Sequence, residues 1–83
     1  MRMTYDASVD AAYIYVIDHI GAGAVRETHP CEPGGGKGVF NLDFDESGRL
    51  LRIEVLGARS ILPAEVLNKA EWPSTHGVLG DKR

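Results

Sequence analysis

The chain has few cysteines, no long apolar run and no excess of basic residues, features that disulfide-stabilised, membrane and nucleic-acid-binding proteins require. A single cysteine among 83 residues, Cys31, excludes an intrachain disulfide framework and favours a reducing compartment. The longest apolar run, residues 11–17, is far shorter than the roughly 20 residues that span a bilayer, and the N-terminus carries no signal-peptide run. Nine Lys and Arg against twelve Asp and Glu give a net charge of −3, which disfavours binding to a phosphate backbone. We therefore expect a cytoplasmic protein that binds neither nucleic acid nor membrane.

Residues 39–56 carry the clearest structural pattern in the chain. Apolar and polar residues alternate in both halves, which is the period of strands with one face on a core and one toward water. The apolar positions are Phe40, Leu42, Phe44, Leu51, Ile53 and Val55. Between the halves, residues 45–48 (DESG) are typical of a turn in which glycine supplies a positive φ. The pattern predicts a β-hairpin.

The remaining segments are shorter and predict a mostly β, α+β fold. The expected elements are strands at 1–5, 12–17 and 24–29, a turn or single helical coil at 7–10, a loop at 30–38, and a helix at 64–70 with Pro63 at its first position. This arrangement predicts an antiparallel meander of four to five strands. We expect one domain over 1–83, with a β-rich core at 1–62, a short helix at 63–73 and a mobile tail at 74–83.

The same hairpin also matches a calcium-binding sequence pattern. Asp43, Asp45, Ser47, Gly48 and Glu54 fall at positions 1, 3, 5, 6 and 12 of an EF-hand loop. An EF-hand needs a helix before the loop, and the glycine-rich residues that precede this one cannot form it. Alternation after the glycine also extends the chain, so the glutamate would not fold back to the aspartates. The hairpin interpretation is therefore preferred, and no metal site is predicted.

Other candidate binding residues lack partners at the required spacing. The glycine-rich loop at 33–38 has no hydroxyl residue after Lys37 and no following helix, so it is not a P-loop, although its amides could hold an anion. The possible soft metal ligands, His19, His29, Cys31 and His76, are too few for the four paired donors of a structural zinc site.

An acid–base pair is the remaining catalytic candidate. Asp6 and Asp10 flank the first predicted turn, with Tyr5, Tyr13 and Tyr15 nearby. Capping by Asp6 and core or interface packing of the tyrosines is the preferred explanation of these residues, and no nucleophile accompanies them. We predict no catalytic residue and no cofactor.

Four segments form an ordered set of motifs. They are residues 4–6 (TYD), 9–14 (VDAAYI), 40–50 (FNLDFDESGRL) and 53–58 (IEVLGA). Together they resemble the short bacterial proteins of the family called domain of unknown function 2283, which typically carry a tyrosine–aspartate opening, an A-D-A-x-Y-I strand and an acidic D-G-R-[LV] hairpin. The resemblance covers residues 1–62. Val9 stands where the family usually has alanine, and the loop PCEPGGGKG is longer than the family's short acidic connection.

The resemblance implies a compact, β-rich cytoplasmic protein with no established activity, cofactor or catalytic residue. Some relatives are suspected partners of small toxins. From the residues themselves we expect a non-enzymatic interaction module, acting as a homodimer and binding another protein, because the apolar strand at 12–17 and the side chains of Val66, Leu67 and Trp72 offer contact surface. The alternative is a small-ligand or metal-binding protein that uses the acidic turn at 43–54 or the glycine-rich loop at 33–38.

Overall fold

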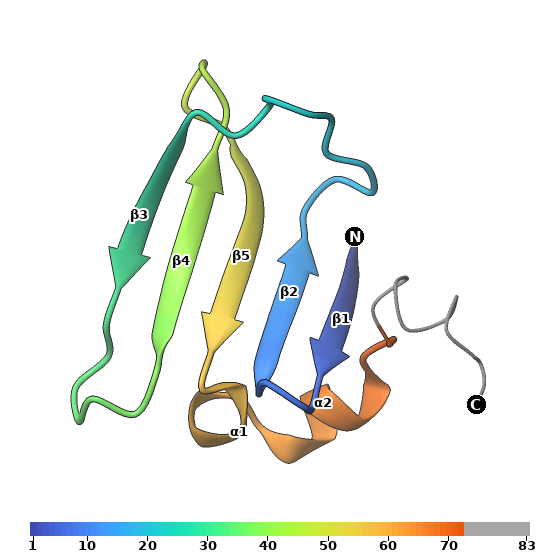
Figure 1. Cartoon of the computed structure of the whole chain (residues 1–83), viewed down its shortest axis with the longest axis vertical. Helices are drawn as coiled ribbons and strands as arrows, with labels where there is room; N and C mark the ends of the chain where they lie inside the picture. Colours follow the sequence, from blue (N-terminus) through green and yellow to red (C-terminus); the bar gives the residue numbers. More distant parts are fainter. Residues whose placement is uncertain (73–83) are drawn as a thin grey trace.

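The protein is a single five-stranded antiparallel sheet with two short helices at one end (Figure 1). The computed structural model describes residues 1–72. The elements are β1 (Arg2–Asp6), β2 (Ala11–Tyr15), β3 (Glu27–Cys31), β4 (Val39–Phe44), β5 (Leu50–Leu56), α1 (Ala58–Ile61) and α2 (Ala64–Lys69). The mostly β composition expected from the sequence is confirmed. The predicted tail at 74–83 lies outside the described residues.

The predicted hairpin is present as β4 and β5. Leu42 pairs with Ile53 and Phe40 pairs with Val55, so the apolar positions of both strands share one face. The turn is held by the Asp45 carboxylate, which accepts hydrogen bonds from the backbone N–H groups of Ser47 and Arg49 at 2.9 Å each. Gly48 has a φ of 81°, a conformation that a residue with a Cβ rarely adopts.

The predicted meander is wrong, because consecutive strands are not always neighbours. The strand order is β1-β2-β5-β4-β3, and β2 pairs with β5 instead of β3. Residues 16–26 leave β2 and cross the end of the sheet opposite the helices to reach β3 (Figure 1). Strands β3, β4 and β5 pair in succession, and β2 lies beside β5, so these four strands form a Greek key. The more apolar β2 thereby gains a partner on each side, whereas the fully exposed β3 takes the edge.

Strand boundaries differ from the expected ones around β3. β2 ends at Tyr15, and β3 runs from Glu27 to Cys31 instead of covering 24–29. Pro30 was expected in a loop, because proline cannot donate a backbone hydrogen bond, yet it lies inside β3. An edge strand tolerates a proline because one side of its backbone has no neighbouring strand.

The predicted helical pieces are only partly correct. Residues 7–10 form a turn without a helix, in which the Asp6 carboxylate accepts hydrogen bonds from the Ser8 backbone and hydroxyl. The C-terminal helix is confirmed as α2, but Pro63 is its N-cap and not its first helical residue. The short helix α1 was not predicted. After α2, Glu71 exchanges backbone hydrogen bonds with Met3 and Tyr5, so the chain adds a short bridge to the outer edge of β1.

The two faces of the sheet differ sharply in composition. One face, called here the apolar face, consists of Met3, Tyr5, Ala12, Ile14, Phe40, Leu42, Phe44, Ile53 and Val55. The opposite one, called the polar face, consists of Arg2, Thr4, Tyr13, Tyr15, Thr28, Asn41, Asp43, Arg52 and Glu54. Ile61 of α1, Leu67 of α2 and Leu62 between the two helices pack against the cluster of Ala12, Val55 and Ala58. They therefore cover one end of the apolar face and form a small core there.

Candidate functional site

A row of polar side chains crosses the whole sheet on the polar face. Arg2, Tyr15, Arg52, Asp43 and Thr28 are paired in register, one from each strand. The Arg2 guanidinium carbon lies 4.2 Å from the centre of the Tyr15 ring. Arg52 Nε donates to Asp43 Oδ2 at 2.8 Å, and Thr28 Oγ1 donates to Asp43 Oδ1 at 2.6 Å. The row is thus one connected set of polar contacts from β1 to β3.

The next row along the polar face holds a second, smaller network. Tyr13 donates its hydroxyl to Glu54 Oε2 at 3.2 Å, and Asn41 Nδ2 donates to Glu54 Oε1 at 3.0 Å. The two rows touch where the Arg52 guanidinium carbon lies 5.6 Å from the Tyr13 ring centre and the Tyr13 and Tyr15 rings stack at 6.3 Å. The tyrosines on β2 therefore link the arginines on the two neighbouring strands.

The charges of these networks are fixed by their surroundings. Burial acts to lower the pKa of Arg52, but its hydrogen bond to Asp43 and the charge of that carboxylate outweigh the effect, and the pKa is raised. Burial and the neighbouring Glu54 carboxylate raise the pKa of Tyr13. Both groups therefore stay protonated at neutral pH. They serve as hydrogen-bond donors and carry no proton-transfer function there.

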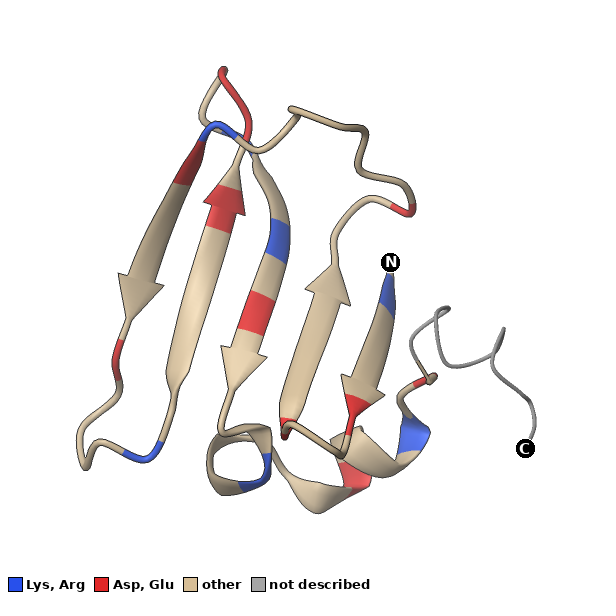
Figure 2. Ribbon diagram, in the orientation of Figure 1, with Lys and Arg blue, Asp and Glu red and all other residues tan. Residues whose placement is uncertain are grey.

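An open pocket of about 410 Å³ lies at the end of the polar face remote from the helices. Its floor is formed by the sheet residues Arg2, Tyr15 and Arg52. Its rim comes from the β2–β3 connection, with Asp18, His19, Ile20, Gly21, Gly23 and Val25. Figure 2 shows one basic and one acidic position on each of β1 and β5, and β2 between them carries no charged residue. We call this feature the arginine pocket.

The sequence pointed elsewhere for a binding site, to the acidic turn. The carboxylates there accept hydrogen bonds from other side chains of the protein. Asp43 accepts from Arg52 and Thr28, and Glu54 accepts from Tyr13 and Asn41. Asp45 accepts from Ser47 and Arg49, and these hydrogen bonds lower its pKa against the effect of burial. Across residues 1–72, no three His, Cys, Asp or Glu side chains gather at one point that could hold a metal ion.

The glycine-rich loop packs against the junction of β5 and α1. A Cβ on Gly38 would meet the carbonyl oxygen of Leu56 and lie 2.9 Å from Ile61 Cδ1. A Cβ on Gly57 would lie 2.6 Å from the Lys37 carbonyl oxygen. These two glycines allow the backbones to approach each other closely. The loop had suggested an anion site, but close packing against Leu56 and Ile61 explains why a glycine is present at position 38.

Asp10 connects the first turn to α1. Its side chain accepts hydrogen bonds from the Tyr5 hydroxyl at 2.8 Å and from the Arg59 backbone N–H at 2.9 Å. Its carbonyl oxygen accepts from the N–H groups of Gly57 and Ala58, both at 3.1 Å. Asp10 has a φ of 54°, which aspartate tolerates better than most residues. The pairing of Asp10 with Tyr5 that the sequence suggested is real, and it organises a helix start.

The role of Asp10 predicts an acid-sensitive contribution to stability. Burial acts to raise its pKa, but hydrogen bonds from Arg59 and Tyr5 and the Arg59 charge lower it below the ordinary value of 3.8. Stability from this group is therefore present above pH 3.8 and lost as the pH falls through the lowered pKa. Urea unfolding of Asp10→Asn should show a deficit at pH 7 that shrinks as the solution is acidified below the ordinary pKa. A deficit of constant size across this range would contradict the prediction.

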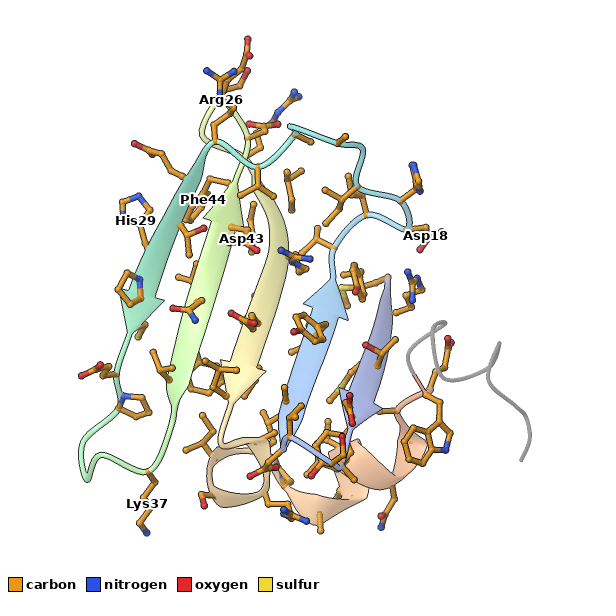
Figure 3. All side chains as sticks on the ribbon, viewed as in Figure 1. Asp18, Arg26, His29, Lys37, Asp43 and Phe44 are labelled. Carbon is orange, nitrogen blue, oxygen red and sulfur yellow. The ribbon has the colours of Figure 1, made fainter. Side chains whose placement is uncertain are left out.

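Among residues 1–72, the histidines and the cysteine do not belong to a group that could hold a metal ion. His19 is on the rim of the arginine pocket, and His29 lies on exposed β3, with its ring 5.4 Å from that of Phe44 (Figure 3). Cys31 is exposed at the end of β3. His76 lies outside the described residues. His29 and Cys31 thus share the edge strand β3, whereas His19 lies on the β2–β3 connection.

Sequence reasoning did not identify Arg2, Tyr15 and Arg52 as neighbours. The two arginines lie 50 positions apart and on strands that are not consecutive in the chain. The alternation of polar and apolar residues predicts that Arg2, Tyr15 and Arg52 each lie on the polar side of their own strand. The sequence contains no further sign that they are neighbours. Only the pairing of β2 with both β1 and β5 brings them to the same pocket.

Comparison with known proteins places the chain in a family. No curated protein and no solved structure matches it. No helix within residues 1–72 is long and apolar enough to cross a membrane. A family model, described as protein of unknown function (DUF2283), matches residues 2–59, which span all five strands and the start of α1. The match confirms the resemblance seen in the sequence, and the chain belongs to this family.

Proposed function

We propose that the protein is a non-enzymatic interaction module that acts as a homodimer, with the apolar faces of two sheets packed together. The observation that carries the proposal is the incomplete cover of the apolar face. Folded domains normally consist of at least two packed layers, whereas this sheet has only the short helices at one end as a second layer (Figure 1). The shortest dimension of the molecule is accordingly 18 Å.

The buried core is small for a folded protein. Within residues 1–72, the fully or nearly buried apolar residues are Ala11, Ala12, Leu51, Val55 and Ala58, and Val55 is the largest side chain among those that are completely buried. Ile14, Phe40, Leu42, Phe44 and Ile53 are only half-buried although they lie on the apolar face. A small domain with so little buried surface gains stability from a further apolar layer.

A second copy suits this face better than a charged partner does. On the four neighbouring strands β1, β2, β5 and β4, the apolar face carries no Asp, Glu, Lys or Arg, and Tyr5 is its one ionisable side chain. The other ionisable side chains of this face, Glu27, His29 and Cys31, are on the edge strand β3. Away from that edge, two such faces meet around a two-fold axis without opposing like charges. Two sheets at the usual spacing of about 10 Å would bury the half-exposed apolar side chains between them.

The solution mass of the purified protein tests the proposal. Light scattering should give twice the chain mass of 9.0 kDa, and Leu42→Glu should shift the protein to a monomer by placing a charge in the interface. Leu42 is half-buried and outside the cluster around Ala12, Val55 and Ala58, so the variant should keep its circular dichroism spectrum.

The matched control is Leu56→Glu. Leu56 is 37% exposed and lies on the polar side of β5, in register with Ala11. The same substitution there should leave the dimer intact. A wild-type monomer at micromolar concentration, or dissociation by both variants alike, would overturn the proposal.

A further inference from the structure

The arginine pocket lies on the opposite side of the sheet from the proposed dimer interface and has its own chemistry. We propose that it binds the phosphate group of a small phosphorylated molecule, with the guanidinium groups of Arg2 and Arg52 as its cationic contacts. Planar guanidinium groups present several N–H donors at once and match the oxygens of a phosphate.

Arg2 is held in place while most of its donors remain available. Its guanidinium lies against the Tyr15 ring at 4.2 Å, a cation–π contact that orients the group. Its hydrogen bond to the chain is a long one, 3.4 Å from Nη2 to the Asp18 carbonyl oxygen. Among residues 1–72 it forms no ion pair with a carboxylate. The positive charge of Arg2 is therefore not neutralised by a described neighbour.

Arg52 supplies the second cationic group from the other side of Tyr15. Its Nε donates to Asp43, and its side chain lines the pocket next to Tyr15, its partner in register on β2. The Asp43 carboxylate, on a residue that is 3% exposed, offsets part of its charge and holds the side chain in one position. Figure 3 shows Asp43 on β4, beside β5. Arg52 is thus pre-positioned in its charged form, which lowers the ordering cost of binding a ligand.

The rim of the pocket is compatible with an anion. Asp18 is the carboxylate on the rim, and it lies 3.5 Å from the positively charged N-terminal amine of Met1. A Cβ on Gly21 or Gly23 would meet nothing within 4 Å, so a ligand reaches the backbone there without obstruction. Ile20 and Val25 add apolar surface. Among the residues that line the pocket, the two arginines outnumber the one carboxylate, Asp18.

The geometry favours a phosphate monoester over a carboxylate. A carboxylate is matched by a single guanidinium fork, whereas a phosphate dianion has three oxygens and can accept hydrogen bonds from two guanidinium groups. The pocket volume of about 410 Å³ lies in the range of small-molecule sites and exceeds what an isolated ion needs. We therefore infer a phosphate joined to a group of metabolite size.

Nuclear magnetic resonance titration of the full chain tests the inference. Ribose 5-phosphate, inorganic phosphate and ribose should each be added to ¹⁵N-labelled protein at constant ionic strength. The two phosphates should shift the amides of residues 18–25 and of Tyr15 and Arg52 along saturable curves, and ribose should not. Arg2→Gln should weaken the binding about tenfold, as expected for loss of one charge-assisted contact.

Two controls separate this site from general electrostatics and from dimerisation. Arg26→Gln removes an arginine that pairs with Glu46 near the hairpin turn, outside the pocket, and should not change the affinity. Leu42→Glu should bind phosphate as the wild type does, because Leu42 is on the opposite face. Linear, non-saturating shifts, or equal weakening by Arg2→Gln and Arg26→Gln, would overturn the inference.

Discussion

Replacing Arg52 with leucine is expected to lower the free energy of unfolding by about 2–3 kcal/mol, because it leaves the Asp43 carboxylate buried without its cation. The Asp43 side chain is 5% exposed and the Arg52 side chain 30% exposed. Breaking a fully buried pair typically costs about 3–5 kcal/mol, and the partial exposure of the arginine reduces this value. Urea unfolding at pH 7 measures the change, which corresponds to a fall of roughly 10–20 °C in Tm for a chain of this size.

A double-mutant cycle distinguishes the unpaired charge from lost packing. Removing both charges with Asp43→Leu and Arg52→Leu should recover the stability to within about 1 kcal/mol of the wild type, because apolar residues can replace a buried ion pair. The control is Arg49→Leu, which breaks the pair with Asp45, where the arginine is 78% exposed, and should cost less than about 1 kcal/mol. A double variant as unstable as the sum of the single ones would contradict this account.

Replacing Gly57 with alanine is expected to destabilise the protein by about 2–3 kcal/mol, for two reasons. Its φ of 72° is strained for any residue with a Cβ, and the new methyl group would lie 2.6 Å from the Lys37 carbonyl oxygen. The neighbouring backbone of Gly38 lies 3.2 Å from the same position, so no flexible side chain can move aside. Thermal unfolding followed by circular dichroism measures the loss.

Gly34→Ala is the matched control in the same loop. Gly34 has no positive φ and nothing within 4 Å of a Cβ, so alanine there should leave stability unchanged or raise it by less than about 1 kcal/mol. Equal destabilisation at Gly34 and Gly57 would show that the loop, and not the close approach of two backbones, determines the effect.

The hairpin was predictable because its information is local. Alternation over residues 39–56 places Phe40, Leu42, Ile53 and Val55 on one side, and the turn chemistry of DESG sets which residues pair. The same local pattern correctly favoured a hairpin over a helix–loop–helix, since no helix precedes Asp43. The short helix α2 was equally accessible, from a proline followed by good helix formers.

Strand order depends on contacts that no local pattern contains. The pairing of β2 with β5 joins segments that are far apart in the chain, such as Tyr13 and Glu54, and it is the reason that the fold is a Greek key and not a meander. The edge position of β3 then decided that Pro30 could lie within a strand. Helix α1 was missed because its start depends on Asp10, whose carboxylate and carbonyl satisfy the N–H groups of residues 57–59 from a distant turn.

By itself, the sequence determined the β4–β5 hairpin, the helix α2 and the family, because alternation and turn residues act over a few positions and the family motifs are contiguous. It also determined which side chains of each strand share a side. Only the tertiary structure decided which strands are neighbours, and therefore that Arg2, Tyr15, Arg52 and Asp43 form one row. The physical reason is that strand pairing is a long-range choice, made by the burial of apolar faces across the whole sheet.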